Sequence, residues 1–248
     1  MEQVVKVTDI GSGIIEVKMQ DRNARNTFSK ELIKGIIKAF KDITEDQSYK
    51  VIILTGYDNY FCCGGTQEEL FEIYRKEIGF NDLDFFSLPL FCEIPVIAAM
   101  QGHGIGGGLV FGCYADFMIL GKENVYTANF MKYGFTPGMG GTYVIPKKMG
   151  ITLGEEMLYT ASSYRGTELM KRGVQQTIVD KAIVMEKAKE LALKLAEKPR
   201  ISLVALKKQL TRDTRSRIPE VIAAELQMHE VTFHQKEVKE KIESLFGK

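Results

Sequence analysis

Metal-ligand and disulfide patterns are missing from this chain. Its 248 residues contain only four cysteines, and two of them, Cys62 and Cys63, are adjacent. This arrangement matches neither a disulfide framework nor the spacing of a zinc-ligand set. We therefore expect no metal site, no disulfide scaffold and a reducing environment.

A surplus of charge and a long apolar run are also absent. The formal net charge is +1, which by itself gives no reason to expect a nucleic-acid partner. No apolar run is long enough for a membrane span, and no cationic and apolar leader opens the sequence. We expect a soluble, cytoplasmic protein without a membrane or nucleic-acid partner. The content of 45% hydrophobic and 26% charged residues is typical of one globular domain that buries its own core.

Glycine is what the sequence does have, concentrated at two junctions. Phe61–Thr66 follows the apolar run 51–54, and Gly102–Gly108 follows the apolar run 95–100, each ahead of a predicted helix. Glycine allows a backbone to approach a ligand closely, and the first amides of a helix have no partner within the helix. Two such junctions side by side would aim two N–H groups at one oxygen. The residues therefore predict an oxyanion hole.

The apolar pattern predicts strands and helices in alternation, followed by a helical tail. Strands are expected at residues 4–8, 14–19, 50–55, 95–100, 116–120 and 124–127, and helices at residues 31–43, 66–78, 109–114, 154–160 and 166–172, with one more running to 149. The tail is expected to hold helices at residues 184–197, 200–210, 218–234 and 237–245, with Pro199 and Pro219 at starts or bends. The apolar residues of this tail predict either contacts between subunits or a cap on the same subunit.

Four motifs, in order and spacing, resemble the crotonase (enoyl-CoA hydratase/isomerase) superfamily. They are Phe61–Gly65, Gln101–Gly108, Cys113–Asp116 and Gly134–Gly141. The resemblance implies an α/β fold, a crotonase-like spiral of ββα units, over residues 1–195. It implies a C-terminal helical region over residues 196–248 that packs homotrimers or dimers of trimers.

The same resemblance implies an acyl thioester whose carbonyl oxygen is bound by the amides of Gly65 and Gly107. Hydratases of the family carry one glutamate two residues after the triple glycine, where this chain has Val110. They carry a second glutamate seven residues before the proline of the third junction, where this chain has Phe130. Adding water to an enoyl thioester needs a base and an acid, and these two residues supply neither. Val110 and Phe130 are instead expected to form an apolar wall against the acyl group, unless both are core residues only.

Three further stretches resemble one branch of the superfamily, the second crotonase homologue of polyketide β-branching cassettes, as in the bacillaene-type pathway. They are Glu93–Gly104, Tyr126–Pro137 and Glu225–Phe233. This resemblance implies decarboxylation of a 3-methylglutaconyl group on an acyl carrier protein to a 3-methylcrotonyl group, without a cofactor. Its partners would be the carrier protein, the polyketide synthase and the other enzymes of the cassette. The alternatives are an enoyl thioester dehydratase or isomerase of the same fold, or a module that binds the carrier without turnover.

Two ionisable residues match catalytic positions of that branch. His229 would hold a proton near neutral pH, either to hydrogen-bond the substrate carboxylate or to protonate the dienolate. Lys76 is the only lysine between Gly65 and Lys122, and would orient the carboxylate or guide the proton; Tyr74 and Arg75 are rivals for that role. The alternatives without a catalytic role are that His229 is a histidine in an interface and that Lys76 is a solvent-exposed lysine.

The resemblance also places the substrate arm. The loop around Ala24 would line the phosphopantetheine tunnel, and Arg25 would meet a phosphate of the arm, unless it is merely an exposed loop residue. Carrier proteins are generally acidic, so the lysines at positions 34, 38 and 41 form a candidate docking surface or an ordinary solvated face.

Overall fold

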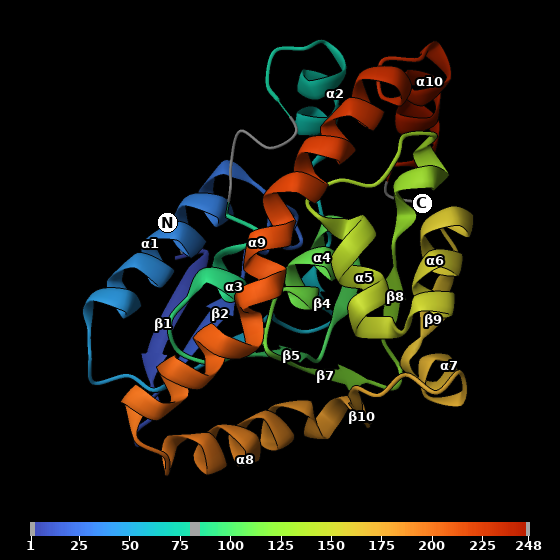
Figure 1. The fold of residues 1–248 in the computed structure, drawn as a ribbon. Coiled ribbons are helices and arrows are strands. Elements are labelled where there is room, and N and C mark those ends of the chain that lie inside the picture. Colours follow the sequence, from blue (N-terminus) through green and yellow to red (C-terminus); the bar gives the residue numbers. More distant parts are fainter. Residues whose placement is uncertain (1–2, 80–84, 247–248) are drawn as a thin grey trace.

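A six-stranded sheet forms the centre of the computed structural model, which describes residues 3–79 and 85–246 (Figure 1). In spatial order its strands are β1 (Val5–Asp9), β2 (Ile14–Met19), β3 (Val51–Thr55), β5 (Val96–Met100), β7 (Phe117–Gly121) and β10 (Thr177–Val179). β1 and β2 are antiparallel, and the other neighbouring strands of this sheet are parallel. Strands separated by helices along the chain give this mostly parallel sheet.

A shorter second sheet follows the ends of the long strands. Its strands are β4 (Tyr60–Cys62), β6 (His103–Ile105), β8 (Val125–Thr127) and β9 (Ser163–Arg165), in that order. The glycine junctions were expected to lead directly from the long strands into helices, but each one contains part or all of a three-residue strand of this second sheet, β4 or β6. Strands this short have no periodicity for the sequence pattern to show.

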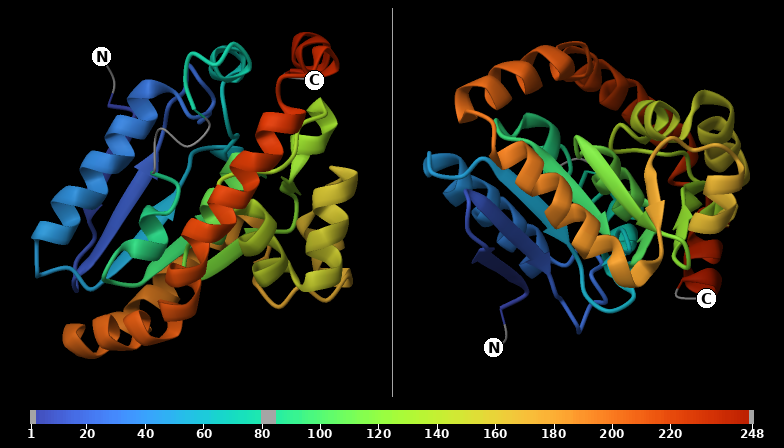
Figure 2. Two further views of the ribbon diagram at one scale, coloured as in Figure 1. Left: turned by 45° about the horizontal axis from the view of Figure 1, so that its top comes forward. Right: turned by 90° about the horizontal axis from the view of Figure 1, so that it is seen from below.

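Helices cover both faces of the large sheet (Figures 1 and 2). They are α1 (Lys30–Glu45), α2 (Gln67–Tyr74), α3 (Leu88–Phe91), α4 (Gly107–Cys113), α5 (Gly141–Met149), α6 (Ile151–Thr160), α7 (Gly166–Lys171), α8 (Val184–Ala196), α9 (Arg200–Thr232) and α10 (Lys236–Leu245), with 3₁₀ turns η1 (Asn129–Tyr133) and η2 (Lys181–Ile183). The α/β fold class is confirmed. None of the helices within residues 3–79 and 85–246 is long and apolar enough to cross a membrane.

The two faces of β3 belong to two different parts of the core. Ile52 and Leu54 pack into the larger cluster, while Val51 and Ile53 face α8. Alternate residues of a strand point to opposite faces, so a continuous apolar run is what a strand buried on both sides requires. α8 presents small side chains to the sheet at four-residue spacing; these are Val184, Ala188, Ala192 and Ala196.

α2 ends earlier than expected. The prediction of a helix to residue 78 is wrong, because the helix stops at Tyr74 and Lys76 adopts the left-handed conformation (φ +59°). The N–H of Lys76 donates to the Ile73 carbonyl, and the N–H of Glu77 donates to the Glu72 carbonyl. This pair of bonds is the Schellman pattern, which usually has glycine at the left-handed residue. The chain therefore turns away at a lysine that gave no sequence signal of a cap.

α9 is one helix where two were expected. It runs through Pro219 and crosses the molecule from α8 to α10 (Figures 1 and 2). Pro219 is exposed, so water can satisfy the carbonyl that its missing N–H leaves without a partner. The buried residues of α9 recur at spacings of four and seven, which keeps one stripe against the core; they are Leu203, Lys207, Thr214, Ile218, Glu225 and His229. The division of the chain near residue 195 stays a prediction, as does the trimer.

Candidate active site

A cavity of about 590 Å³ lies where the two glycine junctions meet. Gly64, Gly65, Gly106 and Gly107 line it, together with parts of α1, α2, η1 and the loop before α5. This volume is within the usual range for small-molecule sites. The predicted junctions are therefore brought together in one concave site.

The backbone of the first junction is fixed by its neighbours. The Phe28 N–H donates to the Gly64 carbonyl at 2.7 Å, and the Cys63 N–H donates to the Asn26 carbonyl at 3.0 Å. Gly64 has φ +76°, and a Cβ placed on it would lie 3.2 Å from the Gly107 nitrogen. Only glycine fits this conformation and this close approach without strain. The close approach sets the two junctions against each other.

The amides of Gly65 and Gly107 have no protein acceptor within the described parts of the chain. Gly107 is the first residue of α4, where an N–H has no partner inside the helix. A Cβ on Gly107 would lie 2.7 Å from Phe28 Cε2 and 2.9 Å from Met139 Sδ. The cavity wall therefore closes directly onto this residue, and two donors are available to an oxygen bound there.

Aromatic rings form much of the remaining wall. Phe28 meets Phe85 edge to face at 4.7 Å, and Phe130 meets Phe135 at 6.2 Å; all four line the cavity. Phe85 and Phe86, which precede α3, line the cavity as well. The predicted residue Phe130 thus lies in the wall of the cavity.

Val110 does not line the cavity in the described structure. It is fully buried in α4, and a Cβ on Gly141 would lie 3.2 Å from its Cγ2. Its place is therefore in the packing between α4 and α5, behind the wall. A role for Val110 in substrate binding stays a prediction.

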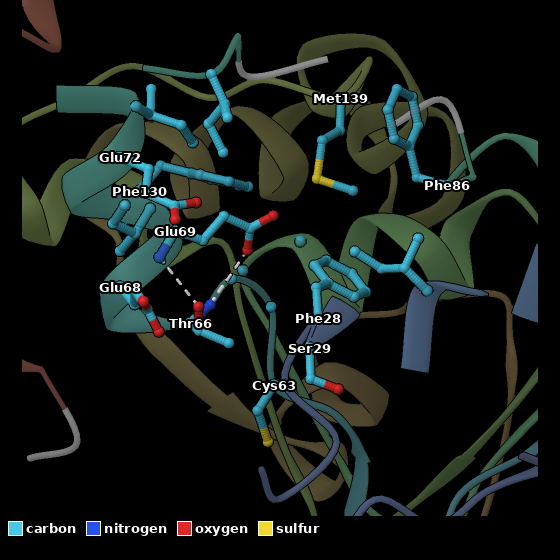
Figure 3. A pocket seen from close by; sticks show the side chains of 18 of the residues that line it. Phe28, Ser29, Cys63, Thr66, Glu68, Glu69, Glu72, Phe86, Phe130 and Met139 are labelled. Carbon is cyan, nitrogen blue, oxygen red and sulfur yellow. Dashed lines mark hydrogen bonds between the residues drawn. The ribbon is translucent and has the colours of Figure 1, made fainter. Parts of the chain in front are cut away.

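Glu69 is a cavity residue that the sequence reasoning missed. Figure 3 shows its carboxylate projecting from α2 into the space beside Thr66, on the side that faces Phe28 and Met139. Its Oε2 accepts from the Thr66 N–H at 3.3 Å, and its own N–H donates to Thr66 Oγ1 at 3.1 Å. The available signal was the Thr66-to-Glu69 spacing of a capping box. Burial raises the pKa of Glu69 to about 7.

Cys63 also lines the cavity, but its thiol is a poor nucleophile. Burial raises the pKa of this thiol to about 11, and the opposing effect of Arg25 is smaller. A thiol that keeps its proton at neutral pH does not attack a thioester efficiently. Among the described residues, no three His, Cys, Asp or Glu side chains lie close enough to hold a metal ion.

The predicted catalytic residues His229 and Lys76 line a second cavity of about 360 Å³. This cavity is formed by the end of α2, the residues after it, and the last turns of α9. Ile73, Ile78 and Gly79 line both cavities, so the two spaces adjoin across the chain reversal after α2. The structure therefore groups His229 with Lys76, next to the cavity of the two glycine junctions and outside its described lining. Because that cavity would hold the predicted oxyanion hole, we call it the oxyanion cavity.

His229 is 5% exposed and is held by the loop before α5. Its Nε2–H donates to the Thr136 carbonyl at 2.8 Å, and its ring meets Phe233 edge to face at 5.8 Å. Burial lowers the pKa of His229, while the hydrogen bonds to Thr136 and Pro137 oppose that effect. His234 lies in the turn after the end of α9, and its Nδ1–H donates to the Tyr74 carbonyl at 3.0 Å.

Lys76 projects from the chain reversal toward α9. Its Nζ lies 3.2 Å from Glu230 Oε2, and the two side chains are 63% and 69% exposed. Its rival Arg75 forms a bidentate ion pair with Glu77 instead, with bonds of 2.7 and 2.8 Å. Of these two cations, only Lys76 lines the second cavity.

Ala24 and Arg25 lie in the turn before α1, outside the described lining of both cavities. The Ala24 carbonyl accepts from the N–H and the hydroxyl of Thr27, and Arg25 is exposed with φ +53°. Arg25 is close enough to Cys63 to lower its pKa slightly. A role of this turn in holding the substrate arm stays a prediction.

Comparison with known proteins places this site in a family. The model for the enoyl-CoA hydratase/isomerase family matches residues 9–247. The chain is 57% identical over 244 residues to the bacillaene synthase decarboxylase PksI of Bacillus subtilis (strain 168), covering 98% of each chain.

Two solved structures agree with this match. One, from a dehydratase/decarboxylase enzyme couple involved in polyketide beta-branching, has a TM-score of 0.98 and 56% identity over 99% of this chain and 100% of its own. The other, the ECH2 decarboxylase domain of CurF from Lyngbya majuscula, has a TM-score of 0.95 and 44% identity over 99% and 100%. The predicted crotonase-like fold and the resemblance to the decarboxylase branch are both confirmed. The chain belongs to the enoyl-CoA hydratase/isomerase, or crotonase, family.

Proposed function

We propose that this chain is a decarboxylase of polyketide β-branching. It converts a 3-methylglutaconyl group, held as a thioester on an acyl carrier protein, into a 3-methylcrotonyl group. The observation that carries the proposal is the pair of amides of Gly65 and Gly107 at one cavity that also holds Phe130. The close similarity of the chain to proteins named decarboxylases supports the same reaction.

The amides act on the electrons released with CO2. When the bond between the carboxyl carbon and its neighbour breaks, the electron pair moves through the conjugated enoyl system to the thioester oxygen. Two N–H donors aimed at that oxygen stabilise the resulting dienolate, and one such donor is typically worth about 2.7–4 kcal/mol. Proton delivery to carbon completes the reaction, so the proposal needs no organic cofactor or metal.

The apolar wall contributes through desolvation of the carboxylate. The charge of the carboxylate disperses as CO2 departs, so a dry surround disfavours the substrate more than the transition state. A carboxylate side chain at position 130 would instead suit hydration chemistry. Phe130 has no ionisable group, so this position in the cavity wall cannot supply the acid or base that hydration needs.

His229 and Lys76 serve the carboxylate end of the substrate in this proposal. The cavity they line meets the oxyanion cavity at Ile73, Ile78 and Gly79. A thioester held by the two amides would direct its carboxylate toward this shared wall. A cation that only paired with the carboxylate would also stabilise the ground state, so its useful role is to orient the carboxylate out of the enoyl plane.

The surroundings of the enzyme follow from the same proposal. The carrier protein docks with its phosphopantetheine arm entering past Ala24 and Arg25, and the synthase and the other cassette enzymes supply the substrate. The protein works in the cytoplasm as a homotrimer or a dimer of trimers. Exposed apolar residues on α6 and α9 support subunit contacts; they include Ile151, Tyr159, Ile201 and Leu210.

Intact-protein mass spectrometry of the carrier tests the proposal. Incubation with 3-methylglutaconyl carrier protein is expected to give a carrier lighter by one CO2, and the His229→Ala and Lys76→Ala variants are expected to slow this loss strongly. Dehydration of 3-hydroxy-3-methylglutaryl carrier protein without CO2 loss would favour a dehydratase instead. Tight carrier binding without any product would favour a binding module.

A further inference from the structure

The carboxyl group of Glu69 stands beside the first oxyanion donor. A Cβ placed on Gly65 would lie 3.3 Å from Glu69 Oε2, so the carboxyl group packs against the residue whose N–H would bind the thioester oxygen. The capping box fixes this position, because Oε2 accepts from the Thr66 N–H while Thr66 Oγ1 accepts from the Glu69 N–H. The rest of the carboxyl group faces the cavity (Figure 3).

Glu69 also lies between the two ends of the proposed substrate. One turn further along α2, on the same face, is Ile73, which lines both cavities. The order along the helix is therefore the oxyanion donor, the Glu69 carboxyl group, and the wall shared with the second cavity. A chain that runs from Gly65 toward the second cavity passes Glu69 with its middle carbons.

Burial keeps a large fraction of the Glu69 carboxyl groups protonated at neutral pH. Desolvation raises the pKa of Glu69 from 4.5 to about 7; Glu72 adds to this rise, while the Thr66 N–H and Lys30 oppose it. Lys30 Nζ lies 3.6 Å from Glu72 Oε1, so its charge is engaged there. The other titratable groups that line the cavity are Glu31, Cys63, Glu68 and Tyr133.

Two other groups at the cavity that carry a proton, a thiol and a phenol, are poorly suited to donate it at neutral pH. Burial raises the pKa of the Cys63 thiol to about 11 and raises the pKa of Tyr133 above its usual value. Both groups would give up a proton reluctantly near pH 7, whereas an acid with a pKa near the working pH transfers its proton efficiently. His229 lines the adjoining cavity rather than this one.

We propose that Glu69 is the general acid that protonates the carbon skeleton of the dienolate after CO2 has left; this rests on the proposed decarboxylation. The Glu69 O–H bond breaks and a C–H bond forms with the electron pair of the dienolate. The thioester carbonyl forms again, and its oxygen loses the negative charge that the two amides had stabilised. The resulting Glu69 carboxylate takes a proton from solvent, so each turnover consumes one proton and releases one CO2.

Glu69→Gln is the decisive variant. Glutamine at this position still completes a capping box, so helix α2 keeps its start while the acidic proton is lost. We expect the rate of CO2 release from 3-methylglutaconyl carrier protein to fall by about 10²-fold or more. The wild-type rate should fall above about pH 7, where Glu69 loses its proton, and the variant should lack this limb.

Thr66→Ala is the matched control, because it removes the other half of the capping box and leaves the acid in place. We expect it to lower the thermal midpoint while the pH limb remains. A Glu69→Gln enzyme with the wild-type rate and pH profile would overturn the inference. Loss of the pH limb in Thr66→Ala as well would also overturn it, since the limb would then report the helix start. If the wild type itself releases no CO2, the proposed function fails, and the role of Glu69 falls with it.

Discussion

The two adjoining cavities are built from different materials. The oxyanion cavity presents backbone amides fixed by glycines and by packed rings, whereas the second cavity presents charged side chains from the end of α2 and from α9. Backbone donors held by close contacts keep their positions during the reaction, which is what stabilisation of a developing charge requires. The exposed pair of Lys76 with Glu230 has no such constraint. The difference supports the proposed division of roles, in which the first cavity stabilises the developing charge and the second orients the carboxylate.

α9 joins the two regions through polar contacts. Glu225 accepts from the N–H groups of Gly140 and Thr142 at 2.6 and 2.8 Å, and His229 one turn later bonds to Thr136. Met139, which lies beside Gly107, belongs to the same loop. The helix that bears His229 therefore also positions a wall of the oxyanion cavity.

Among the variants that compare the two cavities, the largest effect is expected at the contact between Gly107 and the residues packed against it. Gly107→Ala would push its new Cβ against Phe28 and Met139 and displace the donor from the bound oxygen. A displacement of about 1 Å can cost about 10²-fold in rate, and we expect a loss of this scale in a CO2-release assay. Gly112→Ala, later in the same helix, is the control, because its Cβ would make a similarly close contact, 2.8 Å from Met100 Sδ, at a residue that does not line the cavity. Equal losses in both variants would mean that the effect reports the folding of α4.

A smaller effect is expected in the second cavity. Lys76→Met should lower the rate of CO2 release about 10-fold, the scale of a single exposed orienting contact. Its folding free energy should change by no more than about 0.5 kcal/mol, because exposed ion pairs contribute little. Glu230→Gln removes the same pair but keeps the cation, and should leave the rate nearly unchanged. If the two variants behave alike in the rate assay, Lys76 has no role of its own.

The smallest expected effect is a pH dependence of stability at His229. Burial lowers the pKa of His229 in the folded protein, so the unfolded chain binds its proton more readily. This contribution to stability is complete above the unfolded pKa of about 6.5 and is lost as the pH falls below that value. His229→Gln, which can still donate to the Thr136 carbonyl, should lose less stability than the wild type on acidification in chemical denaturation. A larger loss in the variant would contradict the account of His229 as a buried neutral donor.

The meeting of the two glycine junctions at one cavity was predictable because its sequence signal is local. Gly64 requires glycine because its φ is positive, and Gly107 requires glycine because a Cβ would contact neighbouring atoms. Both requirements appear in the sequence as glycine residues. The fold class followed in the same way from apolar runs that match strands buried on both faces.

The rest of the site depends on features without such a signal. The placement of Lys76 follows from a helix that ends at Tyr74, with a lysine in the left-handed conformation after it, whereas the sequence pattern predicted a helix to residue 78. Glu69 was hidden because its spacing to Thr66 indicates only a helix start. The side of α9 that is buried could not be predicted, because four of the six residues in its buried stripe are polar and find partners far along the chain. Lys207, for example, is 4% exposed and pairs with Asp116 at 2.8 Å.

A crystal structure with a glutaryl thioester of pantetheine tests the central claim most directly. The glutaryl group lacks the conjugated double bond, so it cannot form the dienolate and should remain intact in the cavity. We predict that its thioester oxygen lies within hydrogen-bond distance of the N–H groups of both Gly65 and Gly107. Its carboxylate should point past Glu69 toward Ile73 and the second cavity. A thioester oxygen bound away from both amides would contradict the account.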